Sequence, residues 1–445
     1  MKPMRRLFKQ ANIASQDNPM PAIADVLVDE SGVIRDVSPD IPPSTDMKVL
    51  DCSNKILLPG LFDMHVHLRE PGREDKETIE TGTNAAINGG ISGILAMPNT
   101  DPPIDSGGMV RFVRAMARDR SGIPVLTSGC ITKGRAGKSL ADLADMHTQG
   151  AVMITDDGSP VADPYLFRRA LEYSRHFDII VASHCEVPEL SRGGAMNEGA
   201  QSYRLGLPGI PACSEEISIE RDLRLAQCAD ARIHIQHIST ARGLAIIRRF
   251  KEEGVRVTCE VTPHHLLFSD NDIQDYNTHL KMNPPLRSPE DNKALLDGLN
   301  EGLIDVIATD HAPHTRFEKE LDFASSPFGI TGLDTALISL FTHLINKGLI
   351  GWDCLVRRFA SEPRRILQLE PADIVTGSTA DFIVFDPNGR THVNNSFIKS
   401  KSINTPYLGL ELCGSVDMMV RGTEILLDRG GCRNEPLFSS KGGME

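Results

Sequence analysis

The sequence predicts an α/β protein built on a (β/α)8 barrel of the TIM type, with a small β domain formed by the two ends of the chain. Two observations favour this fold. Between residues 56 and 370, eight short apolar runs alternate with amphipathic stretches of helical length, and polar side chains recur where the runs end. Apolar strands separated by helices are typical of a parallel sheet covered on its outer face, and eight such units indicate a barrel.

The eight runs that predict strands are rich in Ile, Val, Leu and Ala. They cover residues 56–67, 92–99, 124–129, 151–158, 179–186, 231–239, 255–263 and 305–313. Helical periodicity lies between them, over residues 78–89, 107–120, 164–177, 217–229 and 244–254. This alternation of strand and helix predicts βαβ units throughout the central part of the chain.

The two ends of the chain are expected to form one small β domain. Residues 1–55 contain two strand-like runs around a turn at Ser31-Gly32, and residues 371–445 contain further strand–turn patterns. We therefore expect residues 1–55 and 371–445 to be the two parts of the small domain, and residues 56–370 to be the barrel.

Composition and charge limit the functions open to the chain. Its 47 basic and 60 acidic residues leave a formal net charge of −13, which argues against partners such as nucleic acid or an anionic membrane. No apolar run reaches the roughly 20 residues that span a bilayer, and the basic start lacks the apolar core of a secretory signal. The nine cysteines form no C-x-x-C pair, which favours buried thiols in a reducing cytoplasm. Cys185 could be read as a nucleophile, but a small residue at a strand end is the stronger interpretation.

Polar side chains lie at or near the carboxyl end of seven of the eight predicted strands. They are His65 and His67, Asn99, Asp157, His184, His237, the region 260–264, and Asp310. A barrel of parallel strands gathers these ends at one mouth, where barrel enzymes carry their active sites. Any one of these residues could be a simple hydrogen-bonding side chain, whereas the whole series predicts a functional site.

His65 and His67 are the strongest indication of a metal site. Residues two apart on a strand face the same side, so both imidazoles can point into the barrel mouth. The further candidate ligands are Asp157, His184, His237 and Asp310. Imidazole and carboxylate without thiolate suit Zn²⁺ or another borderline divalent ion, and six ligands exceed the needs of one tetrahedral ion. We therefore expect two zinc ions bridged by a carboxylate and a hydroxide.

The chain resembles the amidohydrolase superfamily, and within it the class I dihydroorotases. The shared motifs occur in order over nearly the whole length: "GLFDMHVHLREPG", "MPNTDPPID", "DDG", "AMNEG", "LGLPGIP", "EVTPHH", "KMNPPLR", "TDHAPH" and "FGITGLDTAL". The resemblance implies that His65 and His67 hold one metal ion and that His184 and His237 hold the second.

The resemblance also implies which residue bridges the two ions. Many relatives in the superfamily use a carboxylated lysine, whereas class I dihydroorotases use an aspartate, and "TDDG" contains no lysine. Asp157 is the expected bridge because it directly precedes the glycine, as the bridging residue of the family does. Asp156 is the alternative.

The activity that the resemblance implies is the reversible cyclisation of N-carbamoyl-L-aspartate to L-dihydroorotate with release of water, a step of de novo pyrimidine (UMP) synthesis. A hydroxide between two divalent ions is a nucleophile at neutral pH and would attack the ring carbonyl. Asp310 would carry the proton between the hydroxide and the ring nitrogen. A metal-binding or helix-capping aspartate is the other interpretation of Asp310.

Arg69 is the expected receptor for the substrate carboxylate, because a guanidinium can form two parallel hydrogen bonds with a carboxylate. By resemblance, the other substrate-binding residues are Asn99, Asn283, His314, Phe328 and Gly329. Asn99 and His314 would complete the anion pocket, and Asn283 would bind the ring amide. A turn asparagine before two prolines is a nearly equal interpretation of Asn283.

Three other histidines are expected outside the site. His234 alternates out of phase with His237 and should pack against a helix, whereas His264 and His265 should have structural roles.

Two other functions are compatible with the motifs. A hydantoinase, dihydropyrimidinase or allantoinase would use similar metals, but such enzymes resemble lysine-bridged sites without this arginine. A non-catalytic scaffold for aspartate transcarbamoylase would have lost metal ligands that are present here. For an active chain we still expect a homo-oligomer, a dimer, with aspartate transcarbamoylase as a possible partner.

Overall fold

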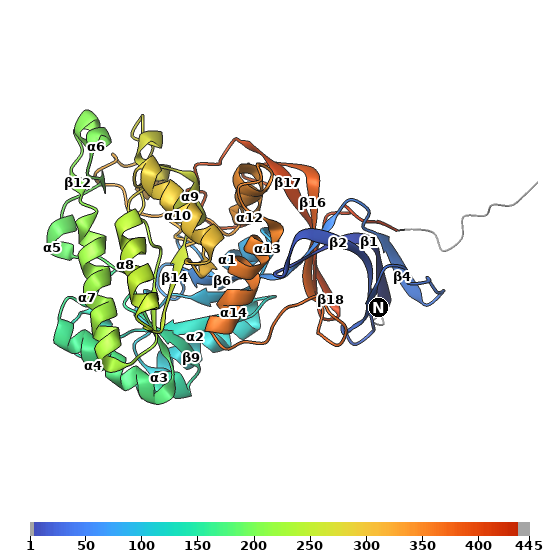
Figure 1. Cartoon of the computed structure of the whole chain (residues 1–445), viewed down its shortest axis with the longest axis horizontal. Coiled ribbons are helices and arrows are strands. Elements are labelled where there is room, and N and C mark those ends of the chain that lie inside the picture. Colours follow the sequence, from blue (N-terminus) through green and yellow to red (C-terminus); the bar gives the residue numbers. More distant parts are fainter. Residues whose placement is uncertain (1–3, 435–445) are drawn as a thin grey trace, which may run out of the picture.

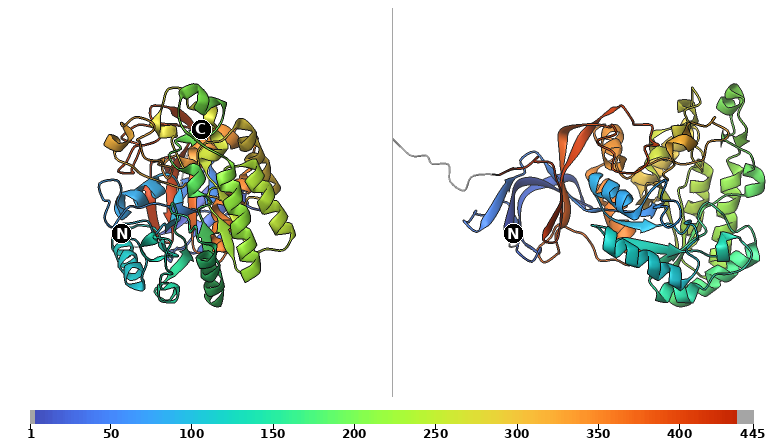
Figure 2. Two further views of the ribbon diagram at one scale, coloured as in Figure 1. Left: turned by 90° about the vertical axis from the view of Figure 1, so that its left-hand side faces the viewer. Right: turned by 180° about the vertical axis from the view of Figure 1, so that it is seen from behind.

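The structure is a computed structural model that describes residues 4–434 of the 445-residue chain. The outermost residues of the two expected terminal segments, 1–3 and 435–445, lie outside the described residues. A barrel wrapped in helices makes up one side of the molecule, and a sheet built from both ends of the chain makes up the other (Figures 1 and 2). Within the described residues, no helix has the length and apolar character to cross a membrane.

The barrel consists of eight parallel strands, as predicted. They are β6 (Leu61–Val66), β7 (Ile91–Ala96), β8 (Val125–Gly129), β9 (Ala151–Ile154), β10 (Ile180–Ser183), β13 (Ile233–Ile235), β14 (Val257–Val261) and β15 (Val306–Ile307). They pair in chain order from β6 to β15. His311, just beyond β15, completes the circuit through a parallel bridge to Val66, and its carbonyl accepts a hydrogen bond from the amide of His67 at 2.9 Å.

The first predicted strand proved to be two strands. Residues 56–67 form β5 (Ile56–Pro59) and β6, separated at Gly60. β5 pairs with strands of the terminal sheet and β6 pairs with β7, so this short stretch passes from one sheet to the other. The apolar run is continuous because both strands are buried, and periodicity alone could not separate them.

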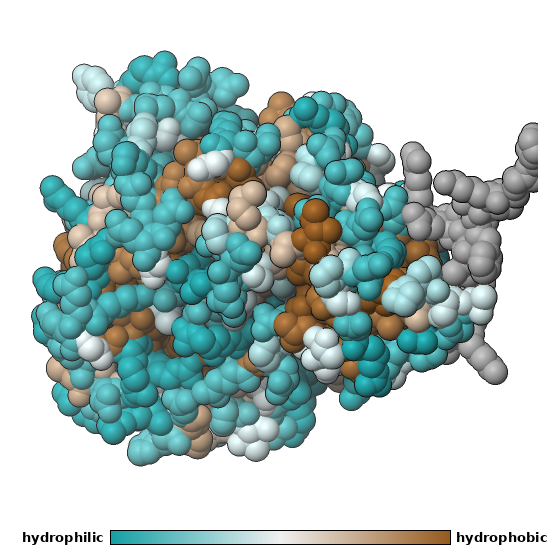
Figure 3. Space-filling view, turned by 45° about the vertical axis from the view of Figure 1, so that its right-hand side comes forward, coloured by the Kyte–Doolittle hydropathy of each residue, from teal (hydrophilic) through white to brown (hydrophobic). Residues whose placement is uncertain are grey.

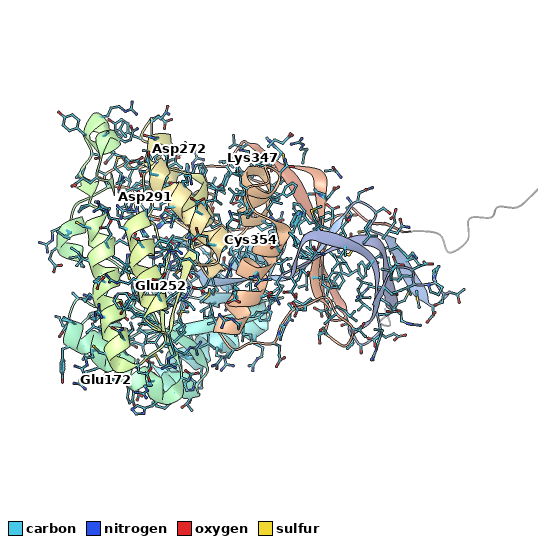
Figure 4. The ribbon with its side chains drawn as sticks, in the orientation of Figure 1. Glu172, Glu252, Asp272, Asp291, Lys347 and Cys354 are labelled. Carbon is cyan, nitrogen blue, oxygen red and sulfur yellow. The ribbon has the colours of Figure 1, made fainter. Side chains whose placement is uncertain are left out.

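Helices on the outside of the barrel connect its strands. They are α1 (Ile79–Asn88), α2 (Gly107–Arg120), α3 (Leu143–Thr148), α4 (Pro164–Ser174), α7 (Cys213–Ala229), α8 (Ala241–Glu252) and α10 (Pro289–Glu301). Several begin where a side chain accepts a backbone hydrogen bond, as Thr78, Ser106, Asp163 and Thr240 do. Figure 4 labels Glu172 on α4 and Glu252 on α8, which lie on this helical shell. The five predicted helices are confirmed, α7 beginning four residues earlier than expected.

Short elements are inserted at the mouth or follow the last barrel strand. The mouth insertions are α5 (Pro188–Ser191), β11 (Met196–Asn197), α6 (Ala200–Leu205), β12 (Gly209–Ile210), α9 (Pro263–Leu267) and α11 (Arg316–Lys319). Single 3-10 turns cover Lys133–Arg135, Arg175–Phe177, Asp270–Asp272 and Thr278–Leu280. After β15 come α12 (Ala336–Leu340), α13 (Trp352–Val356) and α14 (Glu362–Ile366), with π-helical turns at Phe341–Ile345 and Arg357–Ser361.

The two ends of the chain share one sheet, as predicted. Its strands are β1 (Arg5–Ser15), β2 (Asn18–Val28), β3 (Ile34–Ser38), β4 (Met47–Asp51), β5, β16 (Asp381–His392), β17 (Glu411–Arg421), β18 (Glu424–Asp428) and β19 (Arg433–Asn434). β5 lies between β1 and β16 and thereby joins the N-terminal strands to the C-terminal ones. In Figure 3, hydrophilic residues cover most of the visible face, and apolar residues reach the surface where the sheet meets the barrel.

Arg364 on α14 ties the barrel to the terminal sheet. Its buried guanidinium donates to the carbonyl of Gly60 at 2.7 Å, to the Ser92 hydroxyl at 3.0 Å and to the Asp381 carboxylate at 3.2 Å. These partners lie on the β5–β6 junction, on β7 and at the start of β16, so one side chain holds three elements together.

We expect Arg364→Met to lower the free energy of unfolding by about 3 kcal/mol, because it leaves the partly buried carboxylate of Asp381 and the other acceptors without their donor. Arg365→Met is the matched control: that side chain is 64% exposed and pairs with Glu362, so its loss should change stability by less than about 0.5 kcal/mol. Calorimetric unfolding of the two variants tests this, and equal losses would contradict it.

Candidate metal centre

The carboxylate of Asp157 lies at the centre of a buried cluster of histidines. Its Oδ1 is 3.5 Å from His65 Nε2, 3.6 Å from His237 Nε2 and 3.7 Å from His184 Nδ1. Its Oδ2 is 3.4 Å from His67 Nε2. The structure therefore brings together side chains from the ends of β6, β9, β10 and β13, as the predicted barrel mouth requires.

Asp310 closes the cluster from the end of β15. Its Oδ1 lies 2.9 Å from His67 Nε2 and 3.4 Å from His65 Nε2. Two groups of potential ligands overlap here: His65 with Asp157 and His237, and His65 with His67 and Asp310. All six residues that were predicted as metal ligands thus lie within one site.

Asp156 lies outside the cluster, although it precedes Asp157 directly. Its carboxylate accepts hydrogen bonds from the amides of Ile131 and Thr132, at 2.8 and 3.1 Å, and from the Thr132 hydroxyl. It therefore holds the loop that follows β8. Arg135 donates to the carbonyl of Asp157 and to the Ser159 hydroxyl, which fixes the turn from which Asp157 projects.

A β-bulge in β6 orients His65 and His67. The register between β6 and β7 shifts by one residue between Asp63 and Val66. Phe62 and Met64 face the barrel interior, so a regular strand would turn His65 outward. The Asp63 carboxylate supports the bulge: it accepts from the amides of His65 and Thr309, both at 3.1 Å.

Each of three histidines has its remote ring nitrogen bonded to an oxygen. Glu260 Oε1 lies 2.5 Å from His65 Nδ1, Asn99 Oδ1 lies 2.8 Å from His67 Nδ1, and Glu186 Oε2 lies 3.0 Å from His184 Nε2. An acceptor at one ring nitrogen keeps the proton there and leaves the lone pair of the other nitrogen for a metal ion. The nitrogens left available are those that face Asp157.

Glu186 was missed in the sequence, and Glu260 was noted only as a polar strand end. Glu260 also accepts from the amide of His237 at 3.2 Å and lies 3.0 Å from His234 Nε2. Although burial opposes it, the neighbouring His65 and the hydrogen bonds from His234 and His65 lower the pKa of Glu260 to about 2. Position alone could have indicated Glu186, because it follows His184 by two residues at a strand end.

The expectation for His234 was wrong. Ile233 and Ile235 face the helical shell, so His234 points into the barrel, where it contacts Glu260. His237 nevertheless also reaches the site, because β13 ends at Ile235 and the backbone of His237 has a φ of 30°. A change of backbone conformation after the strand therefore breaks the alternation that the prediction assumed.

His264 and His265 stay close to their expected setting. His265 Nε2 lies 3.0 Å from the carbonyl of Pro284, and its Nδ1 lies 2.8 Å from the Thr262 hydroxyl. His264 is buried, and burial lowers its pKa to about 4. The two rings therefore add no positive charge to the mouth near neutral pH.

The chemistry of the cluster fits a divalent metal ion. Within residues 4–434, His65 Nε2 and Asp157 Oδ1 are buried atoms without a hydrogen-bond partner. Against the effect of burial, the nearby carboxylates of Asp157 and Glu186 raise the pKa of His184 to about 10, and those of Glu260 and Asp157 raise the pKa of His65. The electrostatic potential of the carboxylates is therefore negative at this point, and ligand atoms without hydrogen-bond partners face one another there. A cation site requires both features.

Strained backbone also occurs at this site. Asp310 and Arg69 have φ values of 48° and 61°, in the left-handed region that non-glycine residues rarely occupy. Such a conformation costs about 1–3 kcal/mol and persists where the surrounding structure imposes it, commonly at functional sites.

Arg69 lies beside the cluster with its guanidinium partly buried. Its Nε donates to the carbonyl of Pro313 at 3.3 Å, and no described carboxylate forms an ion pair with it. Burial lowers the pKa of Arg69 to about 10, a value at which the group stays charged near neutral pH. The site therefore contains a guanidinium whose N–H groups can donate to the carboxylate of a bound molecule.

Asn99 and Asn283 reach the cluster by way of its histidines. Asn99 binds His67, as described above. Asn283 Nδ2 donates to Glu186 Oε2 at 2.7 Å and lies 3.4 Å from His184 Nε2. Asn99 thus orients a histidine directly, whereas Asn283 contacts Glu186, which orients another.

His314, Phe328 and Gly329 form one connected unit. His314 Nδ1 lies 3.2 Å from the ammonium of Lys76, so Nδ1 accepts and Nε2 carries the proton that it donates to the carbonyl of Phe328 at 2.7 Å. A side chain at Gly329, whose φ is 138°, would meet Ala312 and His314 within 3.0 Å. Lys76 was not predicted, and no local motif marked it.

We expect Asp157→Asn to weaken binding of added Zn²⁺ at least about tenfold, because it removes the carboxylate that all four histidines face. Asp156→Asn is the matched control: it should keep the affinity for Zn²⁺ and lower the unfolding free energy by about 1–3 kcal/mol, because it breaks buried hydrogen bonds. Competition with a chromophoric chelator measures the affinity, and calorimetry the stability. Equal affinities in the two variants would contradict the placement.

The chain is similar in sequence to proteins named dihydroorotase. It is 45% identical over 414 residues to the dihydroorotase of Carboxydothermus hydrogenoformans, an alignment that covers 92% of this chain and 95% of that protein. It is 43% identical over 397 residues to the dihydroorotase of Caldanaerobacter subterraneus subsp. tengcongensis, with 89% and 91% covered. Residues 54–242 match the family described as Dihydro-orotase-like.

Solved structures of similar fold include the L-hydantoinase (dihydropyrimidinase) from Arthrobacter aurescens. Its TM-score is 0.85 at 24% identity, over 96% of this chain and 97% of that one. The dihydropyrimidinase from Brevibacillus agri NCHU1002 has a TM-score of 0.82 at 20% identity, over 96% and 95%. At 24% and 20% identity these likenesses concern the fold alone, whereas the sequence relatives are 45% and 43% identical over nearly their entire length. The chain belongs to the dihydroorotase family, whose members are cyclic amide hydrolases.

Proposed function

We propose that the protein, loaded with two zinc ions, interconverts N-carbamoyl-L-aspartate and L-dihydroorotate plus water. The observation that carries this substrate assignment is Arg69, a guanidinium that forms no ion pair with an acid among residues 4–434 and lies beside a cluster of metal-ligand type. A cyclic amide that bears a carboxylate matches both features. L-dihydroorotate is such a molecule, whereas a plain dihydropyrimidine or hydantoin ring lacks the anion.

Six residues would hold the metal ions in this proposal: His65, His67, Asp157, His184, His237 and Asp310. Bound divalent ions lower the pKa of water and polarise a carbonyl oxygen. The contribution of the chain is to hold the ligands in place. Glu260, Asn99 and Glu186 fix the ring orientations, and Asp157 is the candidate bridge because it faces histidines from both pairs.

Asp310 would transfer the proton. Although burial opposes ionisation, His65 and His67 hold the pKa of Asp310 well below its usual range, so its carboxylate is ready to accept a proton. In hydrolysis it would take the proton from the attacking water and pass it to the ring nitrogen as the amide bond breaks. In cyclisation it would take the proton from the carbamoyl nitrogen as that nitrogen attacks the carboxyl carbon, and would pass it to the departing hydroxide, which leaves as water.

Arg69 would bind the substrate carboxylate through paired N–H groups. Asn99 and His314 would complete this pocket, and Asn283 would donate its amide to the ring. The His314 Nε2 proton is directed at Phe328 in the structure, so its contact with substrate would require a change of partner. Phe328 and Gly329 would form the wall of the pocket, where the missing side chain of Gly329 leaves room.

We further propose a setting for the enzyme. Ring closure of N-carbamoyl-L-aspartate is the step that de novo pyrimidine synthesis needs, and the nine free thiols suit the cytoplasm. A homodimer, and association with aspartate transcarbamoylase, belong to the same proposal. Size-exclusion chromatography with light scattering, with and without that partner, tests both.

We expect Asp310→Asn to lower kcat for L-dihydroorotate at least about 100-fold, because the amide cannot accept the proton. Asp305→Asn, at the other end of β15, is the control: Asp305 binds Lys251 and the amide of Cys259, so its loss should affect stability but not kcat. Spectrophotometric assays at equal zinc content measure both. An active Asp310→Asn enzyme would remove this residue from proton transfer.

Arg69→Met should raise KM for L-dihydroorotate about thirtyfold, which corresponds to the loss of about 2 kcal/mol from a charge-assisted pair. The slow turnover of 5,6-dihydrouracil, which has the ring but no carboxylate, should stay unchanged. Arg73→Met, on the partly exposed Arg73 that pairs with Asp75, is the control.

If the wild type prefers 5,6-dihydrouracil, the substrate is of the hydantoinase type. If it turns over neither compound, the scaffold function is favoured.

A further inference from the structure

Two buried lysines bind the backbone of the segment that carries Phe328 and Gly329. Lys281 is 2% exposed and Lys319 is 5% exposed. The Lys281 ammonium donates to the carbonyls of Ala324 and Ser326 at 2.8 and 2.6 Å. The Lys319 ammonium donates to the carbonyls of Pro327 and Gly329 at 2.9 and 3.1 Å. Lys281 thus binds the first half of residues 324–329 through two carbonyls, and Lys319 binds the second half through two more.

Within the described residues, no carboxylate forms an ion pair with Lys281 or Lys319, and the nearby rings of Phe328 and Phe323 lie 4.5 and 5.7 Å from the Lys281 ammonium. Desolvation lowers the pKa of Lys319 to about 7 and that of Lys281 to about 8. A buried charge is unfavourable for folding unless polar groups surround it, and here the four carbonyl oxygens of residues 324–329 are those groups.

The segment held by the lysines leads directly to the proposed carboxylate pocket. The carbonyl of Phe328 accepts from His314 at 2.7 Å, and the amide of Gly329 donates to the backbone carbonyl of Lys281 at 2.9 Å. The carbonyl of Gly329 also accepts from Asn404, which in turn accepts from the amide of His314. A shift of residues 324–329 would therefore move His314 and the wall formed by Phe328.

We infer that Lys281 and Lys319 form a lysine clamp, a pair of positioning residues that hold residues 324–329 in the shape that binds the carboxylated substrate. The inference rests on the proposed carboxylate pocket and names residues that support it without touching substrate. Lysine suits this task because one ammonium can donate to two carbonyls at once, and its long stem reaches from a neighbouring element. Lys281 follows a 3-10 turn and Lys319 ends α11, so the clamp joins two separate parts of the chain.

The clamp also explains why the outer part of the segment can be exposed. Ala324 and Ser325 are exposed. Phe323, buried in an apolar cluster with Leu280 and Met282, anchors the start of this stretch, and the lysines and Asp322 bind its backbone. The metal-ligand residues, in contrast, project from barrel strands and from the turns directly after them. Loss of the clamp should therefore disturb substrate binding more than the chemical step.

The test compares Lys319→Met and Lys281→Met with a control variant, Lys293→Met on α10. The Lys293 side chain is 76% exposed and pairs with Asp297 on the same helix. We expect each clamp variant to raise KM for L-dihydroorotate at least about tenfold with kcat within about threefold, since displacement of a binding group by about 1 Å can change rates up to about a hundredfold. Lys319→Gln, which keeps an N–H donor, should recover part of the loss in KM. Zinc content should match the wild type.

Hydrogen exchange of peptides covering residues 322–330 gives a readout independent of turnover. We expect faster exchange there in the clamp variants and unchanged exchange in β6 and β9. Unchanged KM, or a parallel fall in kcat and zinc content, would overturn the clamp. An inactive wild type would instead overturn the proposed function, so the two failures are distinguishable.

Discussion

The carboxylate of Asp157 is the point on which the rest of the site depends. Its two oxygens face imidazoles from β6, β10 and β13, and these strands are far apart in the chain. Asp157 itself follows β9. The closed parallel barrel brings these four strand ends to one place, because each strand contributes its carboxyl end to the same mouth. Removing Asp157 would leave the four histidines without the carboxylate that they all face.

Support for the histidines comes from a second set of buried acids. Glu260 contacts His65, His234 and the backbone of His237, and so connects three residues through one side chain. Its placement on β14, beneath the mouth, keeps its charge away from substrate while it orients the rings. Asp63 acts differently: it stabilises the bulge that turns His65 inward. Orientation of the ligands is therefore distributed over several strands, none of which would suffice alone.

Charge is distributed unevenly around the mouth. The metal-ligand side is rich in carboxylates, whereas the side proposed for the substrate carboxylate has Arg69, Lys76 and, further out, the lysine clamp. Lys76 pairs with Glu318 at 2.7 Å and contacts His314, so its charge is partly neutralised. Burial and the cations Arg69 and Lys76 lower the pKa of His314 to about 2, and the ring is therefore neutral. An anionic substrate would thus find its ring directed to one side and its carboxylate to the other.

The sequence by itself determined the fold and the members of the cluster. Eight apolar runs with polar ends predicted the barrel, and His65, His67, His184, His237 and Asp310 were found because strand ends must meet at one mouth.

The tertiary structure decided what local pattern leaves open. It placed Asp157 rather than Asp156 in the cluster, because Asp156 is taken up by the amides of Ile131 and Thr132. It divided the first predicted strand between two sheets and turned His234 inward. It also added Glu186, Lys76 and the clamp lysines. The physical reason is that a side chain's role depends on which partners satisfy its hydrogen bonds and charge. Most of these partners, such as Glu260 for His65, lie far away in the chain.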